Sequence, residues 1–164
     1  MADVVYSTGY LNGLVKALHD WTAGGDTYRI ILEDSTSTYN PTNASTDKFV
    51  SDAVANGFVE LPNIAGYTGG YGGSGRKAVG TRAVTDDPAG INGEKLTAAN
   101  LTWSAIEAVT GGHTVKGWLL VKDITDDAHS LVVAHFTSAG SQALAGFDLS
   151  INWGANGVLN LINH

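Results

Sequence analysis

Phe147-Asp148-Leu149-Ser150-Ile151-Asn152-Trp153 is the stretch that decides the fold class, because every second residue in it is apolar. A period of two is typical of a β-strand with one buried face and one solvated face. The next four residues, Gly154-Ala155-Asn156-Gly157, contain an Asn-Gly pair, which supplies the positive φ angles of a tight hairpin turn. We therefore predict a closing hairpin between strands at 147–153 and 158–162.

Two continuous apolar runs precede this hairpin, at 117–121 and 131–136. Short runs of this kind are typical of central strands that are buried on both faces. The polar segment 123–129 between them predicts a second hairpin. His135 lies inside the second run, which indicates a hydrogen-bonded histidine of the core or sheet edge and not a metal ligand.

Further strand patterns lie upstream, separated by Gly, Asn, Asp and Pro. They are the segments 28–32, 58–61 and 77–85, and a strand within 95–103 that places Leu101 and Trp103 on one face. About seven or eight short antiparallel strands with such turns predict an all-β fold, a β-sandwich or jelly-roll-like barrel.

The beginning of the chain has a helical period instead. Apolar residues at i, i+3, i+4, i+7 and i+10 predict one amphipathic helix over 8–22, which Gly24-Gly25 would end. We expect residues 1–26 to pack this helix on the sheet and residues 27–164 to form the sandwich, as a single domain. The residues of the stripe are Leu11, Leu14, Val15, Leu18 and Trp21.

The composition is poor in charge and rich in glycine. Charged residues make up 15% of the chain and Gly 21 of 164 positions, against about 25% and about 7% in typical soluble proteins. Such a neutral, turn-rich surface suits a protein that packs against other proteins, and it also fits an ordinary soluble domain. The net charge of −7 argues against nucleic acid as a partner. We expect neither a signal peptide nor a membrane span.

Catalytic motifs fail when their context is considered. Gly70 to Gly75 matches G-x-G-x-x-G, but a strand-like segment follows where a dinucleotide-binding loop needs a helix. There is no cysteine, and the five histidines have no zinc spacing. The acidic turns at 86–87 and 123–127 lack the EF-hand order, although calcium binding there stays an open alternative. We expect no enzyme activity, no cofactor and no metal.

Two polar loops, 33–47 and 66–75, are long for a compact domain, and such loops are usually functional or ordered by a partner. They carry Tyr39, Tyr67 and Tyr71, which could contact a glycan or a neighbouring protein. The tryptophans are expected in the core instead: Trp21, Trp103, Trp118 and Trp153.

A series of short signatures runs from about residue 28 to residue 162. In order they are the strand 28–32, Ser37-Thr38-Tyr39-Asn40-Pro41, Asp47-Lys48-Phe49, Glu60 with Gly66-Tyr67-Thr68-Gly69-Gly70, Leu101-Thr102-Trp103, Leu119-Leu120-Val121, the strand 131–136, and Phe147-x-Leu149-x-Ile151-x-Trp153 with Gly157-Val158-Leu159. This order resembles a family of small structural proteins encoded in tailed-bacteriophage genomes. The chain departs from the family by inserting residues 71–75.

The resemblance implies a component of the virion, a capsid decoration or cement protein that binds the major capsid protein and neighbouring virion proteins. It would be made in the host cytoplasm, lie on the capsid surface and involve no membrane, and a homo-oligomer such as a trimer would fit capsid symmetry axes. The alternative is a receptor- or glycan-binding module of a head, neck or tail fibre. The candidate contact residues are Tyr39, Asn40, Pro41, Tyr67, Tyr71, Arg76 and Ser150.

Overall fold

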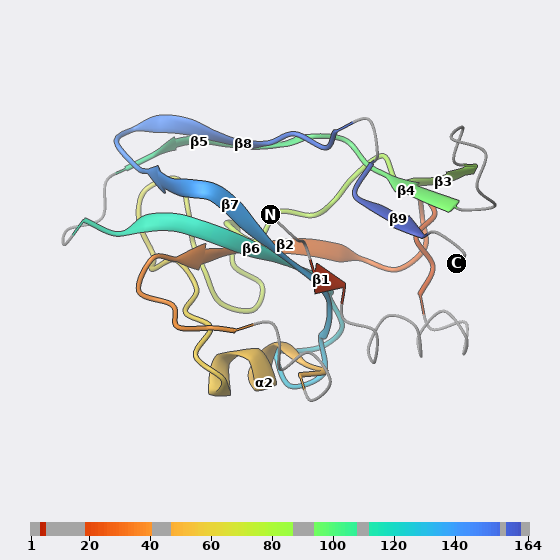
Figure 1. Cartoon of the computed structure of the whole chain (residues 1–164), viewed down its shortest axis with the longest axis horizontal. Coiled ribbons are helices and arrows are strands. Elements are labelled where there is room, and N and C mark those ends of the chain that lie inside the picture. The colour runs from red at the N-terminus through yellow and green to blue at the C-terminus, as the bar shows by residue number, and fades with distance from the viewer. Residues whose placement is uncertain are drawn as a thin grey trace.

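The computed structural model describes residues 4–5, 19–40, 47–86, 94–107, 112–154 and 157–161, and their regular secondary structure is mostly β-strand, as the sequence predicts (Figure 1). The single helix within them is α2 (Val50–Ala55). The strands are β1 (Val4–Val5), β2 (Tyr28–Asp34), β3 (Ala83–Asp86), β4 (Glu94–Thr97), β5 (Leu101–Ile106), β6 (Thr114–Lys122), β7 (Leu131–Ala143), β8 (Phe147–Ile151) and β9 (Leu159–Leu161).

The central sheet has the strand order β1-β7-β6-β2, with every neighbouring pair antiparallel. β6 and β7 form the hairpin predicted from the two apolar runs, and the segment 123–130 connects them. Leu119 and Val121 face a core cluster with α2, while Leu120 and Val133 face the opposite cluster. The prediction that both runs are buried on two faces is therefore confirmed.

Two irregular segments cover the outer edge of β2. The amide of Ile30 donates to the carbonyl of Lys77 at 3.0 Å, and the amide of Val79 donates to the carbonyl of Tyr28 at 2.8 Å. Further along, the amide of Leu61 donates to the carbonyl of Leu32 at 3.0 Å. The segments 58–61 and 77–79 thus pair with β2 through isolated bridges. No regular strand forms at 58–61, and the strand predicted over 77–85 is regular only at its end, where β3 lies.

The prediction of a closing hairpin is wrong. β8 pairs with β5 and β9 pairs with β4, so the two final strands belong to different sheets. The chain does turn between them, because the amide of Gly157 donates to the carbonyl of Gly154 at 2.9 Å. However, the amide of Trp153 donates to Oδ1 of Asn100 at 3.0 Å, which keeps the end of β8 beside β5.

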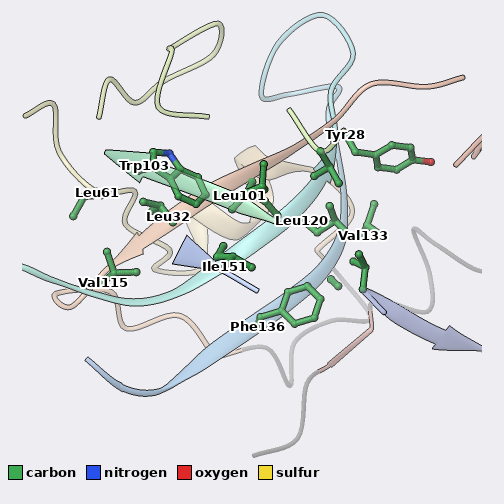
Figure 2. Packing of buried hydrophobic residues seen from close by; sticks show 14 of the residues in the cluster. Tyr28, Leu32, Leu61, Leu101, Trp103, Val115, Leu120, Val133, Phe136 and Ile151 are labelled. Carbon is green, nitrogen blue, oxygen red and sulfur yellow. The ribbon is translucent and has the colours of Figure 1, made fainter. Parts of the chain in front are cut away.

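The main core lies between the central sheet and the β5–β8 pair, and Figure 2 shows side chains of both entering it. Figure 1 shows β5 and β8 on one side of the central sheet and α2 on the other. The predicted alternation holds at Ile151, which is buried, and fails at Phe147, which is 74% exposed. Trp21 and Trp103 are buried as predicted, whereas Trp118 and Trp153 are only half-buried at the margin of the core.

The helix predicted over 8–22 lies outside the described residues up to residue 18, and 19–22 are not helical. The sequence analysis missed α2. Its first turn is closed by the carboxylate of Asp52, which accepts the amides of Lys48 and Phe49 at 3.0 Å each. Val50 and Ala53 face the central sheet, so this short helix exists because it buries one apolar edge.

Candidate contact surface

Arg76 holds the glycine- and tyrosine-rich loop 66–75 to the rest of the molecule. Its side chain is 5% exposed and lies between two carboxylates. Nε and Nη2 donate to the two oxygens of Glu60 at 2.9 and 2.6 Å, and Nη2 also donates to Oδ2 of Asp127 at 3.0 Å. Burial lowers the pKa of Arg76, but Glu60 and Asp127 raise it by more, so the guanidinium stays charged.

Tyr67 lies under the loop, 1% exposed. Its hydroxyl donates to Oε1 of Glu60 at 2.8 Å and accepts the amide of Leu32 at 3.2 Å. Burial, together with the negative charge of Glu60, raises the pKa of Tyr67 well above its usual value, so the phenol keeps its proton. A Cβ at Gly75 would come within 2.6 Å of the Tyr67 ring, which explains why a glycine closes the loop.

Tyr71 stands at the outer part of the loop and is 43% exposed. Its hydroxyl donates to the carbonyl of Ile124 at 2.7 Å, in the turn between β6 and β7. Ile124 is itself 45% exposed. The two side chains form what we call the Tyr71–Ile124 patch, an exposed aromatic and aliphatic pair on two loops that are fixed to each other.

The turn that carries Ile124 is well held. Nε of Arg29 pairs with Oδ2 of Asp123 at 2.6 Å, and Nη1 of Arg29 donates to the carbonyl of Arg76 at 2.8 Å. Further along, Oδ1 of Asp126 accepts the amide of Ala128 at 2.9 Å. The amide of Ile124 donates to Oγ of Ser130 at 3.1 Å, so the turn is closed by its own side chains.

Three of the predicted contact residues are buried, which corrects their assignment. Tyr39 is 4% exposed and donates from its hydroxyl to Asp47 at 2.9 Å. Tyr67 and Arg76 are equally inaccessible, and each satisfies polar groups inside the chain. Sequence patterns do not distinguish a loop tyrosine that points inward from one that points outward, because Tyr39, Tyr67 and Tyr71 all lie in polar loops with no apolar period.

The other predicted contact residues have different environments. Asn40 and Tyr71 are exposed, and Pro41 lies outside the described residues. Ser150 is exposed on β8, where its Oγ lies 2.8 Å from Oγ1 of Thr102 on β5. The structure therefore brings Tyr71 together with Ile124, which the sequence analysis did not single out, and leaves Ser150 on a separate element.

A second polar cluster is centred on the buried carboxylate of Glu33. Nε2 of His135 is 2.8 Å from Oε2 of Glu33, and Oγ of Ser37 donates to Oε1 of Glu33 at 2.6 Å. Nζ of Lys116 lies 3.8 Å from the same carboxylate. His135 is thus the hydrogen-bonded core histidine that the sequence predicts. Every charged group here is paired within the cluster, as buried charges in proteins generally are.

A scan against protein-family models, a search of curated proteins and a search of solved structures each found no match to the chain. Across the described residues, no three His, Cys, Asp or Glu side chains are grouped so that they could hold a metal ion. No helix in the same residues is long and apolar enough to cross a membrane.

Proposed function

We propose that this chain is a structural protein of a bacteriophage virion, a decoration protein that binds the capsid surface and stabilises the head by protein–protein contacts. The order of signatures between residues 28 and 162 supports this proposal, as does the neutral, glycine-rich composition. Its partners would be the major capsid protein and neighbouring copies, for which a trimer fits capsid symmetry.

The observation that carries the proposal is the Tyr71–Ile124 patch. Interfaces gain most of their affinity from a few aromatic and apolar side chains that are ordered before binding. Here Arg76, Glu60 and Asp127 fix the loop of Tyr71 against the turn of Ile124. Little conformational entropy would be lost when these two side chains are covered by a capsid subunit.

We also propose that the fold is a β-sandwich. The central sheet and the β5–β8 pair would be its two layers, since Leu120, Val133 and Trp103 belong to one buried cluster. In such a fold the connections gather at the ends of the layers and present loops to a partner. The loop 66–75 and the turn after β6 would serve in this way.

The test uses heads from which this protein has been genetically removed. We expect the purified chain to bind them saturably, in hundreds of copies as judged by mass spectrometry, because a decoration protein repeats over the capsid lattice. Bound chain should also raise the temperature at which the heads open. Heads that resist heat equally with and without the chain would disprove the decoration role.

The double variant Tyr71→Ala, Ile124→Ser tests the patch itself. Removal of two central contacts typically weakens an interface by about 2 kcal/mol or more, roughly thirtyfold in affinity. Val84→Ser is the matched control, since Val84 is 41% exposed and belongs to β3, which pairs with β4 and is part of neither loop. If the double variant and the control bind equally well, the patch is not part of the interface.

A further inference from the structure

A groove runs along β8, between this strand and Trp118 of β6. It consists of two adjacent cavities of about 390 and 310 Å³ that share Trp118, Ser150 and Ile151 in their walls. Each volume lies at the lower end of the ~300–1,000 Å³ range of small-molecule sites. We call it the aromatic groove; its argued lining residues are Trp118, Phe136, Trp153, Asp148, Ser150 and Asn152.

Three aromatic rings form one wall of the groove. The rings of Trp118 and Phe136 are stacked, with centroids 5.8 Å apart and planes 19° apart. The ring of Trp153 lies 6.0 Å from Phe136, tilted by 60°. Nε1 of Trp153 donates to the carbonyl of Ala99 at 2.9 Å, which fixes its orientation. The ring of Trp153 is therefore held in place before any ligand binds, and both tryptophans are partly accessible.

Trp118 differs from the other three tryptophans because its indole N–H makes no hydrogen bond among the described residues. Trp21 and Trp103 donate to backbone carbonyls at 3.0 and 2.6 Å, and Trp153 does so as well. Nε1 of Trp118 is shielded from solvent and has no hydrogen-bond partner among the described residues. An unpaired buried donor is costly, so an acceptor that reached Trp118 after a small rotation of its half-buried ring would recover free energy.

The polar groups of the groove are rich in acceptors. Asp148 uses Oδ1 to accept the amide of Ala105 at 2.9 Å, and within the described residues Oδ2 has no hydrogen bond. The exposed side chain of Asn152 likewise has no hydrogen bond there and offers one further acceptor and two donors. The described lining contains one carboxylate and no basic residue, which disfavours an anionic ligand.

We propose that the aromatic groove binds a neutral carbohydrate. The C–H face of a pyranose ring carries partial positive charge and stacks on the negative face of Trp or Phe. Its hydroxyl groups can donate to Asp148 and Asn152 and accept from Trp118, whereas the prolines of a proline-rich peptide have no N–H to donate to the carboxylate. This site replaces the buried Tyr39 and Tyr67 as the place of glycan recognition, and it stands whether or not the chain decorates a capsid.

The test follows the indole N–H signals of the ¹⁵N-labelled full chain by NMR, with Trp118 assigned by its loss in Trp118→Phe. The probes are glucose, galactose, mannose, N-acetylglucosamine and their β-linked disaccharides. At least one should shift the Trp118 and Trp153 signals saturably, with a Kd on the order of 1 mM, and leave those of Trp21 and Trp103 in place. If no sugar of this panel shifts either groove signal, the proposal is overturned.

Two variants separate the contributions to sugar binding. Asp148→Asn retains an oxygen for the amide of Ala105 but removes the charged acceptor, and we expect roughly tenfold weaker binding. Trp118→Phe should weaken binding to a similar extent. Tyr71→Ala, which lies in the other surface, should leave it unchanged. Unaltered sugar affinity in both groove variants, or shifts produced by tetramethylammonium or a proline-rich peptide and not by any sugar, would refute a carbohydrate site.

Discussion

Arg76 shows how a single residue can organise a glycine-rich loop in this molecule. In the sequence it is one half of the only adjacent basic pair and suggests an exposed contact. In the structure its guanidinium is enclosed by Glu60 and Asp127, and it joins the loop 66–75 to the turn after β6. The residue therefore positions Tyr71 in the proposed contact surface and is itself buried.

Replacement of Arg76 by Met should destabilise the fold by about 3 kcal/mol, because it leaves two carboxylates close together without their counter-charge. Arg76→Lys should recover only part of this loss, since an ammonium cannot pair with both oxygens of Glu60 in a fork. Urea unfolding at neutral pH measures both effects. Lys48→Met, at an exposed position, is the control and should change stability by less than about 0.5 kcal/mol. A loss at Arg76 no larger than at Lys48 would contradict the enclosed ion-pair network.

At the scale of elements, the pairing of β8 with β5 determines how the C-terminal strands are arranged. Thr102 lies opposite Ser150, and their side-chain oxygens are 2.8 Å apart. Because Asn100 and Ala99 hold Trp153, β8 has a partner before the chain reaches the turn at Gly154. A local hairpin with β9 is thereby excluded.

This register predicts that Thr102→Cys with Ser150→Cys will form a disulfide under mild oxidation. The chain has no other cysteine, and the side chains already approach closely on an exposed face. Closure of a loop of this length is expected to add up to about 4 kcal/mol of stability. Thiol titration and thermal unfolding with and without reductant provide the measurement.

Thr102→Cys with Asn152→Cys is the matched control for that experiment. Asn152 follows Ser150 by two residues, so its Cα should lie diagonally, ~7–8 Å away, which is beyond normal disulfide geometry. Efficient cross-linking of the control pair, with none at 102 and 150, would indicate a different register.

Local sequence patterns predicted the elements better than their partners. The hairpin of β6 and β7 was predictable, because both apolar runs are dense and the polar turn between them is short. The partner of β8 was not, since Phe147 to Trp153 alternates in the same way beside any strand. Helix α2 was missed because its six residues are too few for a helical period.

The candidate surface was predictable only in part. Glycine and tyrosine residues indicated the loop 66–75, and Tyr71 is exposed as expected. Ile124 carries no signal of its own, and it joins the patch only because the Tyr71 hydroxyl reaches its carbonyl. The aromatic groove was hidden for a similar reason, since a tryptophan in an apolar strand has the same pattern in a core and at its margin.

For the molecule as a whole, we expect the free energy of unfolding to fall at acidic pH. Burial raises the pKa of Asp34, but hydrogen bonds from Thr36 and His113 lower it by more, so the value in the folded state lies below the usual 3.8. The folded chain then binds fewer protons than the unfolded chain at acidic pH, and stability falls as protons are added. The pKa values of three further carboxyl groups are also lowered: Asp20, Asp26 and Asp126.

The melting temperature should accordingly vary little between neutral pH and about pH 5 and then fall as the pH passes below 3.8, the usual aspartate value. Asp34→Asn should lower stability at neutral pH and make this decline shallower, so that the variant and the parent converge at low pH. Differential scanning calorimetry over that range measures the two curves. Parallel curves for parent and variant would show that Asp34 does not contribute to the acid response.

The bridges along β2 affect how the protein associates with itself at high concentration. Because the segments 58–61 and 77–79 occupy the hydrogen-bonding groups of that strand, a second molecule cannot extend the sheet there. Open strand edges are the usual starting points of fibrils in crowded cells. With this edge closed, β2 offers no starting point for pairing between molecules when the protein is concentrated.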